Sequence, residues 1–195
     1  MRIVYWSDFN CPYSYIGLKR LTDAVNKLDL NPEWELKSFE LPLTYKIDET
    51  VKEIGRKDNL IISTVSLTST RNAHRLTKFV QNKYPNLSQD LIFKIYEANF
   101  SKNENISDID VLTDIAVSIN LKEDEIRDML LGNSYDFEVE LDTQDALFNG
   151  ITAVPHYILH VDGQQLIVPG AFERQDFEIA VEDLISGEMK NKTFL

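Results

Sequence analysis

The feature that most limits the fold of this chain is its opening, where a buried strand passes directly into a helix. Residues 2 to 6 form a continuous β-branched and aromatic run, which favours a central strand covered on both faces. Residues 7 to 10 are typical of a turn. From Pro12 to Leu28 the apolar side chains recur at helical spacing, with proline in the first turn. Cys11 is therefore predicted to lie at the junction between strand and helix.

A second strand is predicted after this helix. Residues 33 to 41 alternate apolar and polar side chains, with a less regular pattern at the end of the run, and Pro42 terminates it. The chain thus opens with a strand, a helix and a strand, which is the βαβ unit of α/β proteins.

Between Pro42 and Gly150 the apolar spacing is mainly helical, although the Ser/Thr-rich stretch at residues 61 to 65 is ambiguous. Ser88 is expected to cap one helix, and Ser107 with Asp110 resembles a capping box at the start of another. We expect these helices to bury an apolar stripe in the core rather than to line a ligand site. The stripe includes Leu91, Ile95, Leu112 and Ile115.

The end of the chain returns to strands. Residues 149 and 150, Asn-Gly, are typical of a helix end. Residues 154 to 161 and 165 to 168 then predict a hairpin that turns at Asp162 and Gly163, and a final helix follows. The predicted order is therefore βαβ, helices, and ββα.

The charge and the cysteine content restrict the partners and the compartment expected for this chain. The formal net charge is −12 and no Lys/Arg cluster is present, which argues against nucleic acid and anionic membranes as partners. The first residues lack the apolar core of a secretory signal, and no run approaches the roughly 20 apolar residues of a membrane helix. One cysteine excludes an intramolecular disulfide and fits a reducing compartment. We expect a cytoplasmic protein.

The position of Cys11 favours a reactive thiol. A thiolate is the nucleophilic form, and the N-terminus of a helix stabilises negative charge, so the sequence predicts a lowered pKa for Cys11. Cys11-Pro12-Tyr13-Ser14 has the spacing of a Cys-x-x-Cys redox pair, with Ser14 in place of the second thiol. Such a site attacks a disulfide but does not close one on itself.

Simpler interpretations of these residues stay open at this point. A single cysteine is often a small buried hydrophobe. The peptide bond before Pro155 is expected to be trans on frequency alone. His156 and His160 share one face of a predicted strand, but their spacing relative to Cys11 matches no zinc pattern, so we expect no metal site.

Four segments in order resemble the DsbA family, specifically its cytoplasmic FrnE-like branch. They are residues 7–17 (Ser-Asp-Phe-Asn-Cys-Pro-Tyr-Ser-Tyr-Ile-Gly), 72–76 (Asn-Ala-His-Arg-Leu), 150–155 (Gly-Ile-Thr-Ala-Val-Pro) and 170–172 (Gly-Ala-Phe). The resemblance implies an α/β thioredoxin-like fold with an all-helical insertion. Residues 1–42 and 146–195 would form the thioredoxin-like domain, and residues 43–145 the helical insertion.

The resemblance also assigns residues to a site. It implies that Cys11 is the attacking cysteine and that Pro155 is cis and faces it, with substrate lying along the backbone of Val154. Ser14 departs from the family pattern, which usually has a second cysteine there. The residues expected to be catalytic are Cys11, Ser14 and Pro155, and those expected to bind substrate are Pro12, Tyr13, Asn72, His74 and Val154.

The sequence therefore predicts a monothiol thiol-disulfide oxidoreductase or isomerase. Its substrate is a thiol or disulfide, either protein or small molecule, with glutathione as a candidate co-substrate, no bound cofactor, and a homodimer as one option for its assembly. Two alternatives stay open. One is a glutathione-dependent transferase or isomerase, like the related kappa-class transferases and 2-hydroxychromene-2-carboxylate isomerases, although Glu173 is acidic where those relatives tend to be polar or basic. The other is a non-catalytic binding module.

Overall fold

The computed structural model describes residues 1–44, 46, 48–63 and 67–187. None of the helices within these ranges is long and apolar enough to span a membrane. In chain order the elements are β1 (Arg2–Ser7), α1 (Pro12–Lys27), β2 (Glu33–Ser38), α2 (Thr50–Lys57), α3 (Arg71–Lys83), the 3-10 turn η1 (Pro85–Leu87), α4 (Ser88–Tyr96), the π-helical turn η2 (Glu97–Ser101), α5 (Ile109–Val117), α6 (Glu123–Leu131), α7 (Asp136–Phe148), β3 (His156–Val161), β4 (Gln164–Pro169) and α8 (Arg174–Ser186).

The strands form one mixed sheet in the order β2-β1-β3-β4. β1 pairs in parallel with β2 and antiparallel with β3, and β3 pairs antiparallel with β4. Asp162 and Gly163 turn the chain between β3 and β4 with φ angles of 48° and 77°, the left-handed values that a two-residue hairpin loop requires. The predicted βαβ, helical and ββα order is confirmed.

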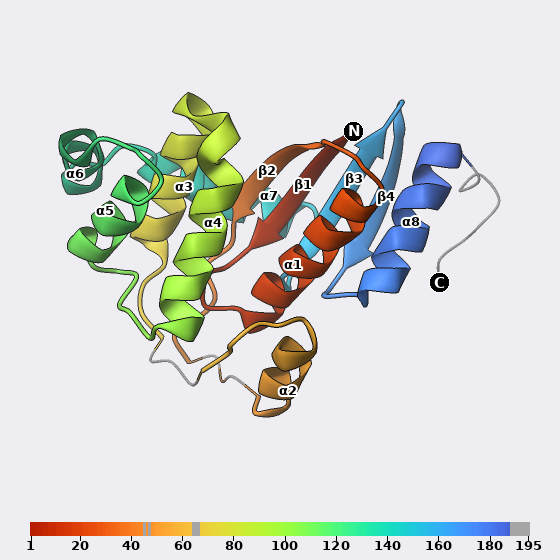
Figure 1. Cartoon of the computed structure of the whole chain (residues 1–195). Helices are drawn as coiled ribbons and strands as arrows, with labels where there is room; N and C mark the ends of the chain where they lie inside the picture. The colour runs from red at the N-terminus through yellow and green to blue at the C-terminus, as the bar shows by residue number, and fades with distance from the viewer. Residues whose placement is uncertain (45, 47, 64–66, 188–195) are drawn as a thin grey trace.

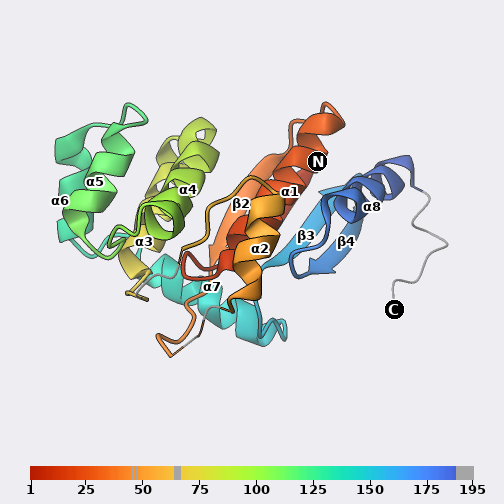
Figure 2. The same ribbon diagram turned by 60° about the horizontal axis from the view of Figure 1, so that its bottom comes forward.

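The sheet is covered on both faces. In Figure 1, α1 and α8 lie in front of it and α7 lies behind, while α3 to α6 stack beside β2; Figure 2 shows α7 crossing under the sheet. Gly17 lets α1 approach β3 closely, because a Cβ at this position would lie 2.6 Å from the hydroxyl of Tyr157. Behind the sheet, Val4 and Trp6 of β1 pack against Ala146 of α7.

The main core runs without a break from the sheet into the helical segment. Tyr15 of α1 stacks on Tyr96 of α4 with ring centroids 5.0 Å apart, and Phe100 stacks beside both. The predicted apolar stripe is buried, which confirms its place in the core: Leu91, Ile95, Leu112 and Ile115. Helices α2 to α7 occupy the chain between β2 and β3, and the division into two domains at residues 43 and 145 stays a prediction.

Side chains of the helical segment cover the outer edge of β2. The Gln81 carboxamide, oriented to satisfy both groups, donates to the Leu36 carbonyl oxygen (3.2 Å) and accepts from the Leu36 N–H (2.8 Å). Lys78 also donates to the Leu36 carbonyl oxygen (3.2 Å). The Asp142 carboxylate accepts from the Ser38 N–H (2.8 Å). These contacts supply the partners that an edge strand otherwise lacks.

The prediction that the second strand extends to Leu41 is wrong, because β2 ends at Ser38. The Phe39 N–H donates to the carbonyl oxygen of Ser7, the last residue of β1 (3.1 Å). Beyond Ser7 the first strand turns away, and the Leu41 N–H donates instead to the carboxylate of Asp8 (2.5 Å). β1, with which the second strand pairs, thus ends before the apolar pattern of the second strand does.

Both predicted helix caps differ in detail from the structure. Ser88 is the first residue of α4 and its hydroxyl donates back to the Pro85 carbonyl oxygen (2.9 Å), so it caps no N–H group. α5 is capped by Asp108, whose carboxylate accepts from the Asp110 N–H (2.8 Å), rather than by Ser107. Asp108 is the residue with extended backbone angles, which a capping residue needs.

The ambiguous stretch after α2 forms no strand at Ile61 or Ile62, and Val65 lies outside the described residues. The Ser63 N–H donates to the Phe100 carbonyl oxygen (2.9 Å), and the Ser101 hydroxyl donates to the Ile61 carbonyl oxygen (3.1 Å). The stretch is therefore fixed to η2 by isolated hydrogen bonds.

Candidate functional site

Cys11 lies at the start of α1, directly after the turn that follows β1. It is the N-cap residue, with φ −95° and ψ 108°, and its N–H donates to the Asp8 carbonyl oxygen (3.0 Å). Pro12 opens the helix, where its missing N–H loses no intrahelical hydrogen bond. The thiol thus lies at the positive end of a 16-residue helix.

The Val154–Pro155 peptide bond is cis, as the resemblance implies, and lies beside Cys11. Antiparallel pairing places Trp6 of β1 opposite His156 of β3, so the residue before β3 lies at the end of β1 where the turn begins. The Cys11 thiol donates to the Val154 carbonyl oxygen at an Sγ–O distance of 3.5 Å. Segments far apart in sequence therefore form one site.

The prediction of a lowered pKa for Cys11 is wrong. The residue is 2% exposed, and this burial raises the pKa of the Cys11 thiol to about 11. Hydrogen bonds from the Ser14 hydroxyl and from the N–H groups of Ser14 and Tyr13 act in the opposite direction, and the nearby Asp8 carboxylate raises the pKa further. Desolvation of the thiolate outweighs the stabilisation by the helix end. The site is a protonated thiol at neutral pH.

We expect alkylation of Cys11 to be slow at neutral pH and to accelerate by about tenfold per pH unit up to pH 10, because the thiolate fraction grows in that proportion below a pKa of about 11. Iodoacetamide labelling followed by mass spectrometry measures the rate, with circular dichroism to show that the chain stays folded. Free glutathione serves as the control, whose rate levels off at lower pH. A plateau below pH 8 would contradict the assignment.

Ser14 occupies the position of a second thiol and is fully buried. Its hydroxyl forms no well-directed hydrogen bond with the described residues, but it lies near enough to the sulfur to lower the pKa of Cys11. The hydroxyl therefore becomes useful when the sulfur carries charge.

Asp8 is a site residue that the sequence analysis did not single out. It is fully buried, and its carboxylate accepts from the N–H groups of Asn10 (3.2 Å) and Leu41 (2.5 Å). Its carbonyl oxygen accepts from the Cys11 N–H and from the Tyr96 hydroxyl (3.3 Å). Asp8 thus shapes the turn that presents the thiol. The available signal was an acidic residue at the end of a buried strand.

His74 reaches the same turn from α3. Its ring is fully buried and packs on Phe9, with centroids 5.0 Å apart. Its Nε2 lies 3.7 Å from Oδ1 of Asp8, and neither ring nitrogen forms a hydrogen bond with the described residues. The structure therefore buries His74 against the turn that precedes Cys11.

The comparison with family models decides the family. Residues 2–182 match the DSBA-like thioredoxin domain. The chain belongs to this family. The predicted thioredoxin-like fold and the family resemblance are confirmed.

Proteins similar to this DSBA-like protein match it along nearly the whole chain. The uncharacterized protein YwbO of Bacillus subtilis (strain 168) is 24% identical over 198 residues, covering 94% of this chain and 96% of YwbO. A probable DsbA oxidoreductase from Streptomyces coelicolor has a TM-score of 0.80 at 23% identity, covering 100% of this chain and 92% of that one. The cytosolic disulfide reductase DsbM from Pseudomonas aeruginosa has a TM-score of 0.70 at 13% identity, covering 93% and 97%.

A further structural neighbour of the DSBA-like protein is a 2-hydroxychromene-2-carboxylate isomerase. It has a TM-score of 0.77 at 10% identity, covering 99% of this chain and 100% of the isomerase. At these identities the neighbours show the fold, and the chemistry has to be argued from the residues of this chain.

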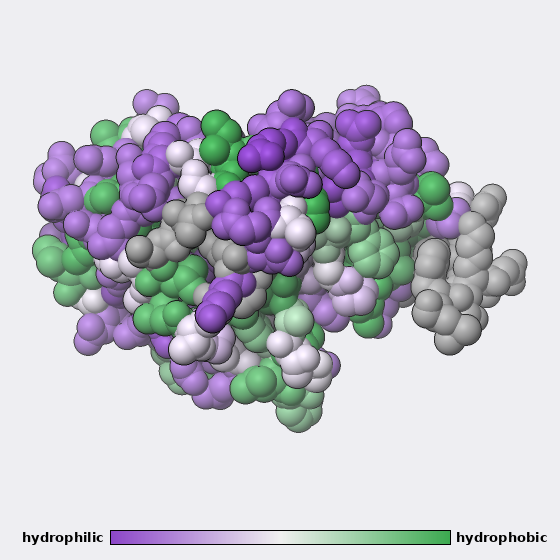
Figure 3. Space-filling view, turned by 90° about the horizontal axis from the view of Figure 1, so that it is seen from below, coloured by the Kyte–Doolittle hydropathy of each residue, from purple (hydrophilic) through white to green (hydrophobic). Residues whose placement is uncertain are grey.

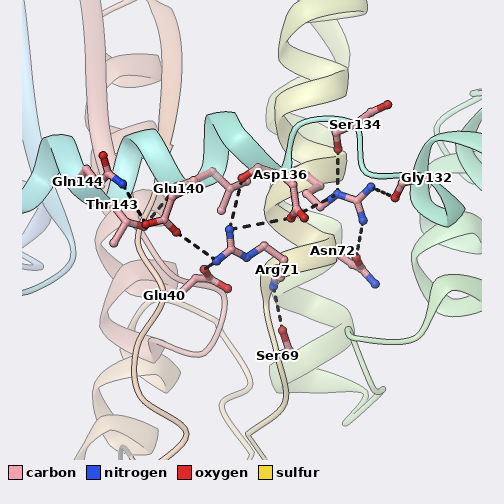
Figure 4. A network of polar contacts seen from close by, with 12 residues as sticks. Glu40, Ser69, Arg71, Asn72, Gly132, Ser134, Asp136, Glu140, Thr143 and Gln144 are labelled. Atoms are coloured by element: carbon pink, nitrogen blue, oxygen red, sulfur yellow. Dashed lines mark hydrogen bonds and ion pairs between the residues drawn. The ribbon is translucent and has the colours of Figure 1, made fainter.

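The hydrogen bonds of the Asn72 side chain lie within the helical segment, where it is joined to Arg75 (Figure 4). Its Oδ1 accepts from Arg75 (2.9 Å) and its Nδ2 donates to the Ser107 carbonyl oxygen (3.3 Å). Arg75 in turn donates to carbonyl oxygens at the end of α6 and just beyond it. These are Met129 (3.0 Å), Leu130 (3.3 Å), Gly132 (2.5 Å) and Ser134 (2.8 Å). Asn72 and Arg75 hold the helical segment together.

Two further side chains hold the turn of the DSBA-like protein in place. Asn10 donates to the Thr68 carbonyl oxygen (2.8 Å), and Asn99 donates to the Phe9 carbonyl oxygen (2.8 Å). Asn99 belongs to none of the motifs found in the sequence, so nothing in the sequence indicated this role. The turn itself is thus tied to the helical segment at Phe9 and at Asn10.

The surface around this end of the sheet carries exposed apolar side chains. Figure 3 views the protein from this end and shows hydrophobic residues gathered in its lower half. Leu43 and Phe172 follow β2 and β4, which both run parallel to β1, and Phe148 ends the helix that leads to Pro155. Their exposed fractions are 59%, 39% and 90%. Within the described ranges no three His, Cys, Asp or Glu side chains are grouped to hold a metal ion.

Proposed function

We propose that this DSBA-like protein catalyses thiol-disulfide exchange through Cys11 alone. The observation that carries the proposal is the position of the only cysteine of the sequence. Cys11 is the N-cap residue of α1, and its sulfur lies 3.5 Å from the Val154 carbonyl oxygen beside the cis Pro155, with Ser14 at the position of a second thiol.

The proposed reaction has two exchange steps. Cys11 Sγ attacks the glutathione sulfur of a mixed disulfide, an S–S bond forms between Cys11 and glutathione, and the original S–S bond breaks. The substrate leaves as a thiolate and takes up the proton that Cys11 gives up. A second glutathione then attacks the Cys11 adduct, which yields oxidised glutathione and returns the thiol with its proton. Attack on a wrongly paired protein disulfide would begin an isomerisation in the same way.

The geometry supports separate roles for the residues around the sulfur. The N–H groups of Tyr13 and Ser14 and the Ser14 hydroxyl stabilise the thiolate as Cys11 ionises. The Val154 carbonyl oxygen, which accepts from the thiol in the resting protein, is the backbone group that an incoming chain meets beside the sulfur. The exposed apolar side chains at this end suit a polypeptide substrate.

Glutathione is the proposed co-substrate and no bound cofactor is needed. A monothiol site requires an external thiol to regenerate it, and a reducing cytoplasm supplies one. A solved structure of DsbM contains glutathione, which supports the same choice for a protein of this fold.

Incubation with oxidised glutathione is expected to add one glutathionyl group to Cys11, and reduced glutathione is expected to remove it again, because Ser14 offers no second sulfur to displace it. Intact-mass spectrometry follows both steps. Ser14→Cys is the matched variant, since its second thiol should displace glutathione and leave an internal disulfide instead of the adduct. A wild-type protein that forms no adduct at any pH at which it stays folded would refute the proposal.

A glutathione-dependent transferase or isomerase is the second candidate. The observation in its favour is the buried, protonated Cys11, because an enzyme that uses the thiolate of bound glutathione does not need its own. The fold shared with the 2-hydroxychromene-2-carboxylate isomerase is compatible with it. Such an enzyme would bind reduced glutathione and keep its activity without Cys11, whereas a binding module would do neither.

A further inference from the structure

Helix α7 carries apolar side chains on the face that points away from the core as well as on the face that packs against it. Val139 and Ala146 are fully buried. On the opposite face Phe137, Leu141 and Phe148 have exposed fractions of 70%, 43% and 90%. Single exposed apolar side chains are common on protein surfaces, but here three of them lie on one helix. The outer face of α7 is therefore unlike an ordinary solvated helix face.

Helical geometry places these three side chains in one line. Leu141 follows Phe137 by four residues and Phe148 follows Leu141 by seven, which are about one and two turns of an α-helix. Gln144 lies between them on the same face, and its carboxamide donates to Glu140 (3.2 Å). Figure 2 shows α7 along the underside of the sheet. We call Phe137, Leu141 and Phe148 the outer stripe.

Carboxylates flank the outer stripe on both sides. By helical spacing, Asp136 and Glu140 lie on one side of it. Glu138 and Asp145 lie on the other side, where Lys37 is 3.8 Å from Asp145. α7 contains no lysine or arginine of its own. Both margins of the stripe therefore carry negative charge.

Neighbouring cations compensate this charge only in part. Arg71 of α3 lies 4.0 Å from Asp136 and 3.6 Å from Glu140. The same guanidinium also pairs with Glu40 (2.7 Å), so one cation serves three carboxylates (Figure 4). Glu138 is exposed and forms no ion pair with the residues that the structure describes. A cation brought by a ligand would therefore find unpaired negative charge beside the stripe.

The charge distinguishes between the occupants that an apolar stripe suits. A second copy bound through the same face would bring one acidic helix against another, because a twofold interface pairs a surface with itself. An anionic lipid surface has the same sign as the carboxylates and is disfavoured likewise. A helix whose apolar stripe is flanked by lysine or arginine is complementary to α7 in both shape and charge.

We propose that the outer face of α7 is a docking surface for a basic amphipathic helix of a partner protein. The apolar side chains of the partner pack on the outer stripe, and its cations pair with the flanking carboxylates. α7 has 13 residues and is about 20 Å long, so it accommodates about three to four turns of a partner helix. Docking requires no chemistry at Cys11, so this proposal is independent of the exchange reaction.

Fluorescence anisotropy with two labelled synthetic helices tests the proposal on the whole protein. Both peptides carry the same leucine stripe at helical spacing, with flanking lysines in one peptide and flanking glutamates in the other. We expect only the lysine peptide to bind at low salt, and its affinity to fall as salt is added, because exposed charges are screened. If the lysine peptide does not bind, or if both peptides bind equally, the proposal is wrong.

The double variant Phe137→Ser/Leu141→Ser locates the binding. It is expected to weaken the lysine peptide by at least about tenfold, because it removes two of the three side chains of the outer stripe. Ile179→Ser/Ile185→Ser on α8 is the matched control, since these side chains are 52% and 44% exposed on another helix. The control should bind like the wild type. No loss in the first variant, or equal losses in both, would overturn the assignment to α7.

Glu138→Gln tests the charge separately. It is expected to weaken the lysine peptide by about two- to fivefold and to reduce the salt dependence, because one exposed ion pair is lost. Glu182→Gln, an exposed carboxylate on α8, is the matched control. Glu138 is exposed, so its variant is expected to fold even if the stripe variant does not. Binding by Glu138→Gln that matches the wild type at every salt concentration would contradict the charge complementarity.

Two further measurements test the other occupants. Sedimentation equilibrium of the protein alone would reveal a second copy on the stripe, if the wild type forms a dimer and Phe137→Ser/Leu141→Ser does not. Cosedimentation with vesicles of phosphatidylcholine, with and without phosphatidylserine, would reveal a lipid surface by the same criterion. Either result would assign the outer stripe to that occupant and overturn the proposal of a basic helix.

Discussion

Cys11→Ser is expected to abolish the exchange of glutathione between disulfides, reducing it to the uncatalysed rate. The sequence has no other cysteine, so no second sulfur replaces the one removed. Serine is nearly the same size as cysteine, so the substitution removes the sulfur with little change in the packing of this buried site. The measurement is the release of thiol from a glutathionylated peptide, with unfolding in urea as the check on the fold.

The same variant separates the candidate functions. If Cys11→Ser binds reduced glutathione and keeps a transferase or isomerase activity of the wild type, the chemistry belongs to glutathione and the monothiol proposal fails. If the wild type exchanges glutathione and Cys11→Ser does not, the transferase fails. If the wild type neither exchanges nor binds glutathione, the remaining candidate is the non-catalytic binding module. Cys11 is then a small buried hydrophobic residue.

Arg75→Met is expected to destabilise the protein by about 3 kcal/mol, which is a large effect for a side chain outside the candidate site. Arg75 is 5% exposed and its guanidinium satisfies carbonyl oxygens at the end of α6, as well as Asn72. Methionine keeps the apolar stem but leaves these buried acceptors without a donor. The midpoint of urea unfolding measures the change.

Arg71→Met on the same helix is the matched control (Figure 4). Arg71 pairs with Glu40 and Glu140, but a third of its side chain is exposed, so water can take over its partners. We expect a loss below about 1 kcal/mol. Equal losses in the two variants would show that burial of Arg75 is not what makes its contacts valuable.

Much of the fold was predictable because its signals are local. β1 is buried along nearly its whole length, as a continuous β-branched and aromatic run indicates, and the Asp162 and Gly163 turn has the backbone angles that its residues favour. The end of β2 was not predictable from its own pattern. The apolar pattern continues toward Leu41, but the Leu41 N–H turns to Asp8 instead of a strand. The strand ended because β1, with which it pairs, turns away after Ser7.

The candidate site was also predictable only in part. The position of Cys11 at the start of a helix, with Pro12 beside it, followed from the order of residues in the sequence. The pKa of Cys11 did not, because burial depends on the chain that covers the thiol, and the Val154 contact joins residues 143 apart in sequence. The pairing of Asp8 with His74 is also a long-range contact. A short stretch of sequence indicates the helix end, which lowers the pKa of the thiol, but it does not indicate the burial, which raises this pKa by more.

The capped outer edge of β2 has a consequence for self-association. Gln81 and Asp142 occupy the backbone groups through which another strand would add to the sheet on that side. β4 lies at the opposite edge with no further strand beside it in the described chain, and Ile167 on it is half exposed. Two copies that joined by continuing their sheets would have to meet β4 to β4, related by a twofold axis. The same asymmetry directs any aggregation through strand addition to that edge.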